Sequence, residues 1–488
     1  MAESLKLGVH GLLHELNTTL GTSYTQNIPS LSYLLSNCIT QNYDFGTVYA
    51  QFRPFWHDLT AIEDSLYTGK KKDKDMQQRA LVGNSIVDIK IPPQHVWDLY
   101  SNRVVPCWVI KNKQWPKPIS HAWVDETDQN NVWMPINRYE WPVPIPKGAN
   151  LDLIRIEMLN LGVEYTWLDV LCLRQKGGKR EDLCAEEWQL DVATIGYLYH
   201  VAEVVVWYLS GLGQPLSLKE GDLDSDWSWF RWAWTLQEIG EDQIIAGDTE
   251  DGPLHAKPID GEGHYADKVL TRFYKQLHAL DNISPDSYDI FDKITGLASC
   301  LESAKIPAYY ENQSLEDAWT ALVNTIIPWL RGDLFFLYPE PGNMGKKWRP
   351  SWDQVIKEPL PTKDSCEAWV GWNEKENEDW CEGYCIEKAT VLGLNMGNME
   401  DADRFGKLII DIYGEKHIFK VTAEHYHPIP EGIYTAISAH TTLERWVIGR
   451  RLPNDRLEKV SVLTLPNPKE REKLKNLQIM TKTLNFLV

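Results

Sequence analysis

The sequence predicts an α/β protein in which a parallel sheet flanked by helices lies between a helical N-terminal region and a β-rich C-terminal domain. From about residue 100 to 300, apolar runs of strand type alternate with helical patterns, as crossover connections between parallel strands require. Helical patterns such as LLHELN and IPSLSYLLSNCI precede residue 98, and β segments such as YCIEKATVLGL, GKLIIDIYG, KHIFKVTAEHY and KVSVLTL follow residue 375. We expect three regions, 1–98, 99–352 and 353–488, with a core at about 118–240.

Composition and charge exclude several classes of protein. A hydrophobic share of 43% is typical of a globular chain, and no apolar run approaches the roughly 18 residues of a membrane span. The formal net charge of -20 repels phosphate backbones, so nucleic acid is not an expected partner. The start MAESLKLGVHGLL lacks the features of a signal peptide, and we expect a cytoplasmic protein.

The eight cysteines are scattered along the chain, which predicts reduced thiols rather than a disulfide framework. Cys381 and Cys385 have neither a second cysteine pair nor a histidine at zinc spacing, so we expect no metal site. In the N-terminal region, Lys70, Lys71, Lys72 and Lys74 alternate with acidic residues, and this stretch is predicted to be a solvated loop.

The expected elements of the core follow in order. PISHAWV at 118–124 is a strand candidate, and in LDLIRIEMLNLG the apolar residues share one helical face before Gly162. VEYTWLDVLCL at 163–173 is typical of a buried strand, and EVVVWYL at 203–209 is β-branched. Between them, Trp188, Val192, Ile195, Tyr199 and Ala202 recur at helical spacing. The unit is βαβαβ, with parallel strands expected near 119–123, 164–172 and 203–209.

Ligands of such sheets bind beyond the carboxyl ends of the strands, and chemically useful side chains stand there. Ser120, His121 and Trp123 follow the first strand, and Asp169 and Arg174 end the second. If SWFRWAWTLQEIG is a helix, Arg231, Trp234 and Glu238 share one face, while Trp229, Trp232 and Ile239 lie on the other. A guanidinium, an aromatic ring and a carboxylate would then converge on one ligand.

Each candidate also has a purely structural interpretation. Arg231 and Glu238 would form an internal ion pair, and Asp169 would cap a helix or satisfy buried backbone N–H groups. His121 would be a hydrogen-bonded core histidine, and Cys172 a small buried hydrophobe rather than a nucleophile. The cationic glycine loop at 176–180 could bind a phosphate. It is not a Walker motif, however, and its structural interpretation is a mobile loop.

Three strings, in this order and spacing, resemble the signature blocks of the fungal heterokaryon-incompatibility (HET) domain. They are ISHAW at 119–123, YTWLDVLCLRQ at 165–175 and WFRWAWTLQE at 229–238. SYDIFDKITGLA at 287–298 and WRPSW at 348–352 are similar to later blocks of the same family. The resemblance covers about 100 to 352 and implies a role in incompatibility or defence through cell death.

The family itself resembles the TIR (Toll/interleukin-1 receptor) domain, which implies a TIR-like sheet at the core. The positions that match the TIR pattern are Ser120, Asp169, Trp234 and Glu238. TIR enzymes use that glutamate to cleave NAD at the nicotinamide glycosidic bond. The resemblance therefore implies NAD or a related nucleotide as substrate, no further cofactor, and self-association that completes or releases the site.

Three function hypotheses follow. In the first, the protein is an NAD hydrolase with Glu238 and Asp169 as catalytic residues and Ser120, His121, Trp123, Arg174, Arg231 and Trp234 as substrate-binding residues. In the second, it is a non-enzymatic signalling module whose aromatic face recruits partners, and Glu238 is structural. The third, a thiol enzyme built on Cys172 and His121, ranks well below these two.

Overall fold

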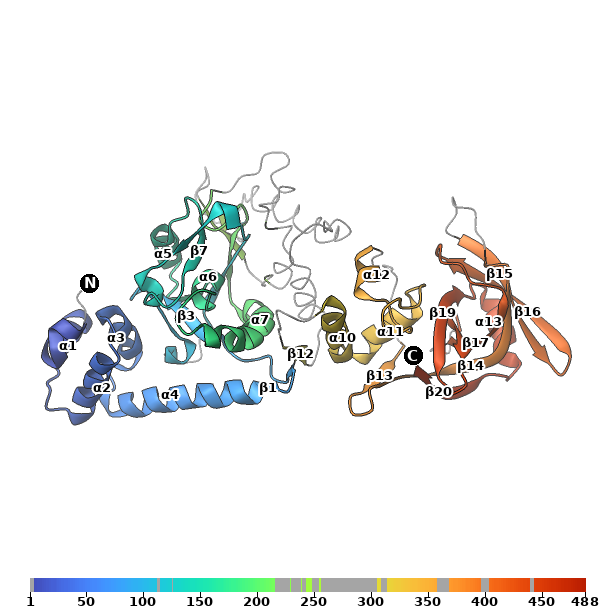
Figure 1. Cartoon of the computed structure of the whole chain (residues 1–488), viewed down its shortest axis with the longest axis horizontal. Coiled ribbons are helices and arrows are strands. Elements are labelled where there is room, and N and C mark those ends of the chain that lie inside the picture. The colour runs from blue at the N-terminus through green and yellow to red at the C-terminus, as the bar shows by residue number, and fades with distance from the viewer. Residues whose placement is uncertain are drawn as a thin grey trace. The chain divides into compact units, whose positions relative to one another are not determined.

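The computed structural model describes residues 4–111, 115–124, 126–215, 229, 238, 243–247, 254–255, 305–308, 314–357, 368–395, 403–438 and 443–488 (Figure 1). The chain divides into two compact units. Unit 1 comprises Met1–Cys300 with Lys305–Asn312, and unit 2 comprises Leu301–Ala304 with Gln313–Val488. The fold is mixed α/β, with a helical N-terminus, a mixed sheet and a β-rich C-terminal part.

The N-terminal region is helical, as predicted. Its helices are α1 (Ser4–Leu20), α2 (Pro29–Thr40), α3 (Phe45–Phe52) and α4 (Leu59–Ala80), and the first three with α4 enclose an apolar cluster around Leu16, Leu35 and Trp56. Asp44 begins α3 by accepting a hydrogen bond of 2.8 Å from the backbone N–H of Thr47, which satisfies one of the free donors at the helix start.

The prediction of a loop at Lys70 to Lys74 is wrong. These lysines lie in α4 and their side chains are exposed, so the charge pattern marks a solvated helix face. Lys, Gln and Arg favour helices, and the Gln77 amide donates to Asp73 at 2.8 Å across one turn. A solvated loop and a solvated helix have the same composition, which is why charge alone did not separate them.

The sheet of unit 1 has seven strands in the described part of the chain, in the order β11-β10-β9-β5-β8-β3-β4. Strands β5 (Lys117–His121), β8 (Tyr165–Trp167), β9 (Val205–Tyr208) and β10 (Gln243–Ile245) run parallel to their neighbours in this group. The edge strands β4 (Arg103–Pro106) and β11 (Leu254–His255) and the inner strand β3 (His95–Asp98) pair antiparallel with their neighbours. The parallel order of the three predicted strands is confirmed, but the sheet as a whole is mixed rather than purely parallel.

The second predicted strand is too long. Strand β8 ends at Trp167, and Asp169–Cys172 forms the short helix α6. A buried strand followed by a buried helical turn looks like one continuous apolar run in sequence. Both elements are surrounded by the core, so neither the two-residue period of a strand nor the 3.6-residue period of a helix is visible. Cys172 is therefore helical, although it is fully buried as expected.

Two predicted helices, α5 (Leu151–Asn160) and α7 (Cys184–Val201), connect the parallel strands. The expected core face of α5 is confirmed, since Leu151, Ile154 and Met158 are buried. Gly162 has φ 72, the left-handed conformation in which a chain commonly leaves a helix. Unit 1 also contains two small sheets, one of β1 (Leu81–Val82), β2 (Ser85–Ile86) and β12 (Ile306–Pro307), the other of β6 (Gln129–Val132) and β7 (Val143–Pro146).

Unit 2 is β-rich, which confirms the predicted character of the C-terminal part. Its strands are β13 (Val370–Asn373), β14 (Glu378–Leu392), β15 (Asp403–Ile412), β16 (Glu415–Glu424), β17 (Gly432–Ser438), β18 (Arg445–Arg451), β19 (Leu457–Thr464) and β20 (Thr481–Leu487). Strands β14 to β19 form a closed ring of pairings, because β14 pairs with both β15 and β17. The β14–β17 pairing has a register shift between Ile386 and Ala389. The helices of unit 2 are α10 (Leu315–Thr325), α11 (Pro328–Phe336), α12 (Trp352–Lys357) and α13 (Pro468–Asn476).

Candidate functional site

The site lies at the edge of the sheet where the parallel strands of unit 1 end. Ser120 and His121 are the last two residues of β5, and Asp169 is the first residue of α6, two residues beyond β8. Since β5 and β8 are parallel neighbours, their carboxyl ends meet at the same edge. The sheet therefore brings the predicted residues of two separate strings together.

Asp169 is held by three N–H donors and in turn orients two aromatic side chains. Its Oδ1 lies 2.7 Å from His121 Nε2 and also accepts from the Val170 backbone at 2.7 Å, while its Oδ2 accepts from Trp123 Nε1 at 2.7 Å. The rings of His121 and Trp123 stack with their centroids 6.0 Å apart and an interplanar angle of 28°. Of the two structural roles expected for Asp169, the bond from the Val170 N–H is a contact to a backbone donor, whereas the helix that begins at Asp169 has no side-chain cap.

Glu238 joins this cluster through Ser120. The Ser120 hydroxyl donates a hydrogen bond to Glu238 Oε2 and accepts one of 2.5 Å from Trp229 Nε1. The backbone carbonyl of Glu238 accepts from Trp207 Nε1 in β9 at 3.3 Å. The carboxyl group of Glu238 is thereby fixed beside the end of β5 by a chain of donors that runs from Trp229 through Ser120.

The electrostatic environment raises the pKa values of two titrating groups of the site, Glu238 and His121. Burial, followed by the charge of Asp169, raises the pKa of Glu238 to about 8, although hydrogen bonds from Ser120 and Trp229 and the charge of His121 oppose the shift. Burial acts to lower the pKa of His121, but the charge and hydrogen bond of Asp169 outweigh it and leave that pKa raised. A glutamic acid with its pKa near neutrality is a candidate for acid, base or electrostatic catalysis.

Arg174 belongs to another cluster. Its guanidinium contacts Glu187 at 3.2 Å and Glu140 at 3.4 Å and lies 4.7 Å from the centroid of the Trp141 ring. These partners compensate its charge in a buried position, so the structure gives Arg174 a packing role and does not bring it to Ser120 and Glu238. Arg174 was predicted to be a site residue because it follows the second predicted strand. In the structure, α6 lies between the end of β8 and Arg174.

The glycine loop at 176–180 is also tied to this second cluster. A Cβ atom on Gly178 would lie 2.6 Å from the Glu140 carbonyl oxygen, and the Lys179 N–H donates to the same oxygen at 2.6 Å. Arg180 pairs with Asp182 at 2.9 Å. Close packing on the 140–141 backbone therefore accounts for Gly178, without a phosphate.

Three further expectations concern residues outside the described part of the chain, namely Arg231, Trp234 and the string at 287–298. Trp229 is a site residue that the sequence pattern missed, because a helical reading put it on the face opposite Glu238. Both side chains in fact meet at Ser120. The only signal for this role was the indole N–H, which needs an acceptor wherever a tryptophan is buried.

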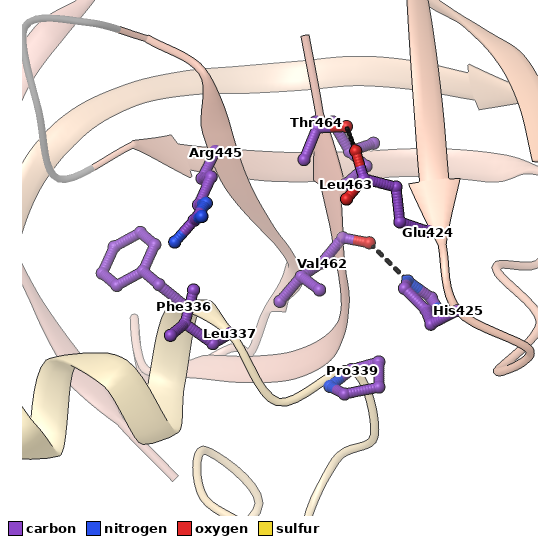
Figure 2. A pocket seen from close by; sticks show the side chains of 9 residues that line it. All are labelled: Phe336, Leu337, Pro339, Glu424, His425, Arg445, Val462, Leu463 and Thr464. Carbon is purple, nitrogen blue, oxygen red and sulfur yellow. Dashed lines mark hydrogen bonds between the residues drawn. The ribbon is translucent and has the colours of Figure 1, made fainter. Parts of the chain in front are cut away.

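A cavity of about 90 Å³ in unit 2 is a separate candidate for ligand binding (Figure 2). Figure 2 shows apolar walls from the end of α11 and from β19, with Arg445 and Glu424 on different sides. Burial lowers the pKa of His425 to about 4, and its Nε2 donates to the Val462 carbonyl at 2.9 Å, so this imidazole is neutral near pH 7. No function is predicted for these residues from the sequence.

Within the described residues, no group of three or more His, Cys, Asp or Glu side chains could hold a metal ion. The same part of the chain contains no helix with the length and apolar character needed to cross a membrane. No family model matches the chain, and neither a curated protein nor a solved structure resembles it closely enough to count as a match. Inferences about function therefore depend on the geometry of the site and on the motifs.

Proposed function

We propose that unit 1 is a TIR-like, NAD-cleaving domain of the HET kind, in a protein that acts in incompatibility or defence by triggering cell death. The observation that carries the proposal is the meeting of Glu238, Ser120 and the Asp169–His121 pair at the carboxyl edge of the parallel strands. Three strings far apart in sequence supply these groups, in the order that the HET resemblance implies. Packing alone does not require two carboxyl groups at one buried strand end.

The proposed chemistry is hydrolysis of the bond between ribose C1′ and the nicotinamide nitrogen. The bonding electron pair leaves with nicotinamide and neutralises its ring charge, and positive charge develops on the ribose. The ionised Glu238 carboxylate stabilises this charge, and water then adds at C1′ and releases a proton. Nicotinamide leaves as a neutral molecule, so the step needs neither a metal ion nor a second cofactor.

The remaining site residues have supporting roles in this proposal. Trp123 is held by its bond to Asp169, so its ring is a fixed flat surface on which a planar ring of the substrate would stack. Ser120 orients Glu238. Arg231 and Trp234 keep their predicted roles in substrate binding, whereas Arg174 is withdrawn from the substrate-binding set because its charge is already compensated.

The test is to incubate the purified full chain with NAD and follow the release of nicotinamide. Glu238→Gln keeps the size of the side chain but loses its charge, and we expect kcat to fall about 100-fold or more. Cys172→Ser is the matched control, because burial raises the pKa of this thiol and both ring nitrogens of His121 contact other groups. Retained cleavage in Glu238→Gln at an unchanged melting temperature, or loss only in Cys172→Ser, would overturn the assignment.

One observation favours the non-enzymatic alternative as a second candidate. Helix α5 exposes Leu153 and Ile156, at 64% and 50% of their surface, on the side opposite its buried face. Adjacent exposed aliphatic side chains on one helix suit a protein contact. If Leu153→Lys with Ile156→Lys abolishes cell death while nicotinamide release by the pure protein is unchanged or was never present, the signalling module is the better description.

A further inference from the structure

The ring of His121 is fixed between two oxygen atoms. Its Nδ1 lies 3.0 Å from the Ala122 carbonyl oxygen, and its Nε2 lies 2.7 Å from Asp169 Oδ1. A carbonyl oxygen has no proton to give, so Nδ1 must carry one. Neutral imidazole has a single N–H, and the bond to Asp169 therefore contains a second proton that belongs either to the ring or to the carboxyl group.

The other bonds of Asp169 decide where that proton resides. Its Oδ1 also accepts from the Val170 N–H, and its Oδ2 accepts from Trp123 Nε1, both at 2.7 Å. A carboxyl group surrounded by N–H donors on both oxygens is stabilised as the anion. The shared proton is therefore on the ring, and His121, with 3% of its side chain exposed, is a buried imidazolium.

The other titratable groups that face this pair from the described residues are neutral or are Glu238. Tyr199 of α7, Tyr208 of β9 and Cys172 of α6 all have their pKa values raised by burial, and so they carry no charge near neutral pH. Asp169 and Glu238 are the described carboxyl groups whose charges act most strongly on His121. Among the described residues, the charge of this pair is thus coupled to that of Glu238.

We infer that His121 is a positioning residue of this site: it is held as an imidazolium between Asp169 and the Ala122 carbonyl, and its charge favours the ionised form of Glu238. Burial and Asp169 both oppose that ionisation, and the hydrogen bonds from Ser120 and Trp229 together with the charge of His121 act against them. The catalytic meaning of this inference rests on the proposed function, because the carboxylate is the form that stabilises a developing cation. The charge of His121 thereby lowers the pH at which Glu238 ionises.

The first test measures the protonation states of His121 and Glu238 directly and does not depend on enzymatic turnover. The full chain is labelled with ¹⁵N in its histidine rings and ¹³C in its glutamate carboxyl groups, and His121→Gln and Glu238→Gln assign the signals. We expect the His121 ring to keep both N–H protons from pH 5 to above pH 7. We also expect His121→Gln, which keeps a donor for Asp169, to move the titration of Glu238 upward by about one pH unit. A neutral His121 at pH 6.5, or a Glu238 titration that does not move, would overturn the inference.

The second test uses the pH dependence of NAD cleavage. In His121→Gln the acidic limb of kcat/KM should shift upward by about one unit, which lowers the rate about tenfold at pH 7 and much less at pH 9. A merely structural histidine would lower the rate at every pH without moving the limb. His200→Gln, at an exposed position, is the control and should leave the profile unchanged. Absence of nicotinamide release from the wild-type chain would count against the proposed function, while the spectra would still decide the inference.

Discussion

Single buried polar residues decide what this site can do. Asp169 is the first residue of a helix, and its carboxyl group contacts a histidine, a tryptophan N–H and a backbone N–H, so one residue is both a structural centre and a candidate for the proposed chemistry. Arg174 differs from Asp169, because its charge is paired with two carboxylates of a separate buried cluster. The chemical type of a residue suggested a role for it, whereas its hydrogen-bond and ion-pair partners are visible only in the fold.

At the residue scale, Lys459 offers a test of stability. It is 1% exposed in β19, and its Nζ contacts the Leu334 carbonyl at 3.3 Å, with burial lowering its pKa to about 7. In the unfolded chain this lysine stays protonated to about pH 10.4. Between these values the unfolded state binds more protons, so the folded state gains stability as the pH rises, and the cost of burying the charge is greatest below pH 7.

We therefore expect Lys459→Met to raise the free energy of unfolding at pH 6 by roughly 1–3 kcal/mol, with a smaller gain at pH 10. Denaturant titrations at the two pH values measure this. Lys416→Met, at an exposed position of β16, should change neither value appreciably. An equal effect of Lys459→Met at both pH values would show that the charge is not the cause.

At the scale of elements, helix α11 packs with its backbone against the chain that enters β13. A Cβ atom on Gly332 would lie 2.0 Å from the Ala368 carbonyl oxygen, and Arg331 donates to the Val370 carbonyl at 3.1 Å from the same turn. Glycine is needed here for close approach, although alanine favours helices.

Gly332→Ala should therefore lower the free energy of unfolding by about 1–3 kcal/mol or more, despite its better helix propensity. Thermal unfolding of the full chain would show this. Gly432→Ala is the comparison, because the atoms nearest to its Cβ would be those of the Tyr434 side chain, at 3.2 Å, and we expect a smaller loss there. Equal melting temperatures for Gly332→Ala and the wild-type chain would contradict the backbone contact.

At the scale of the whole molecule, net charge controls how copies of the chain meet. A charge of -20 makes copies repel one another at low ionic strength, and salt screens that repulsion. If NAD cleavage requires assembly, as the TIR resemblance implies, turnover per molecule should rise with protein concentration and with ionic strength up to about 0.3 M. Light scattering coupled to nicotinamide release tests this, and full turnover by a strictly monomeric chain at every concentration would refute it.

The sequence by itself determined the order of elements in the core and the class of the fold. Period and composition identified the three parallel strands, the buried face of α5 and the β-rich C-terminal part, because burial imposes those periods directly on the residues. Ser120 and Asp169 were also named from sequence, since polar residues at strand ends stand out against apolar runs, and Glu238 was named from the face of an expected helix and from the TIR resemblance.

Only the tertiary structure decided which of these residues meet. The antiparallel edges of the sheet, the end of β8 at Trp167 and the contact of Trp229 with Ser120 depend on segments far apart in the chain, and no local period records them. The same holds for the charge of His121, which follows from one oxygen next to it in the chain and one oxygen from a residue 48 positions away. Long-range hydrogen bonds fixed the site because a buried polar group must find its partner in space, wherever that partner lies in sequence.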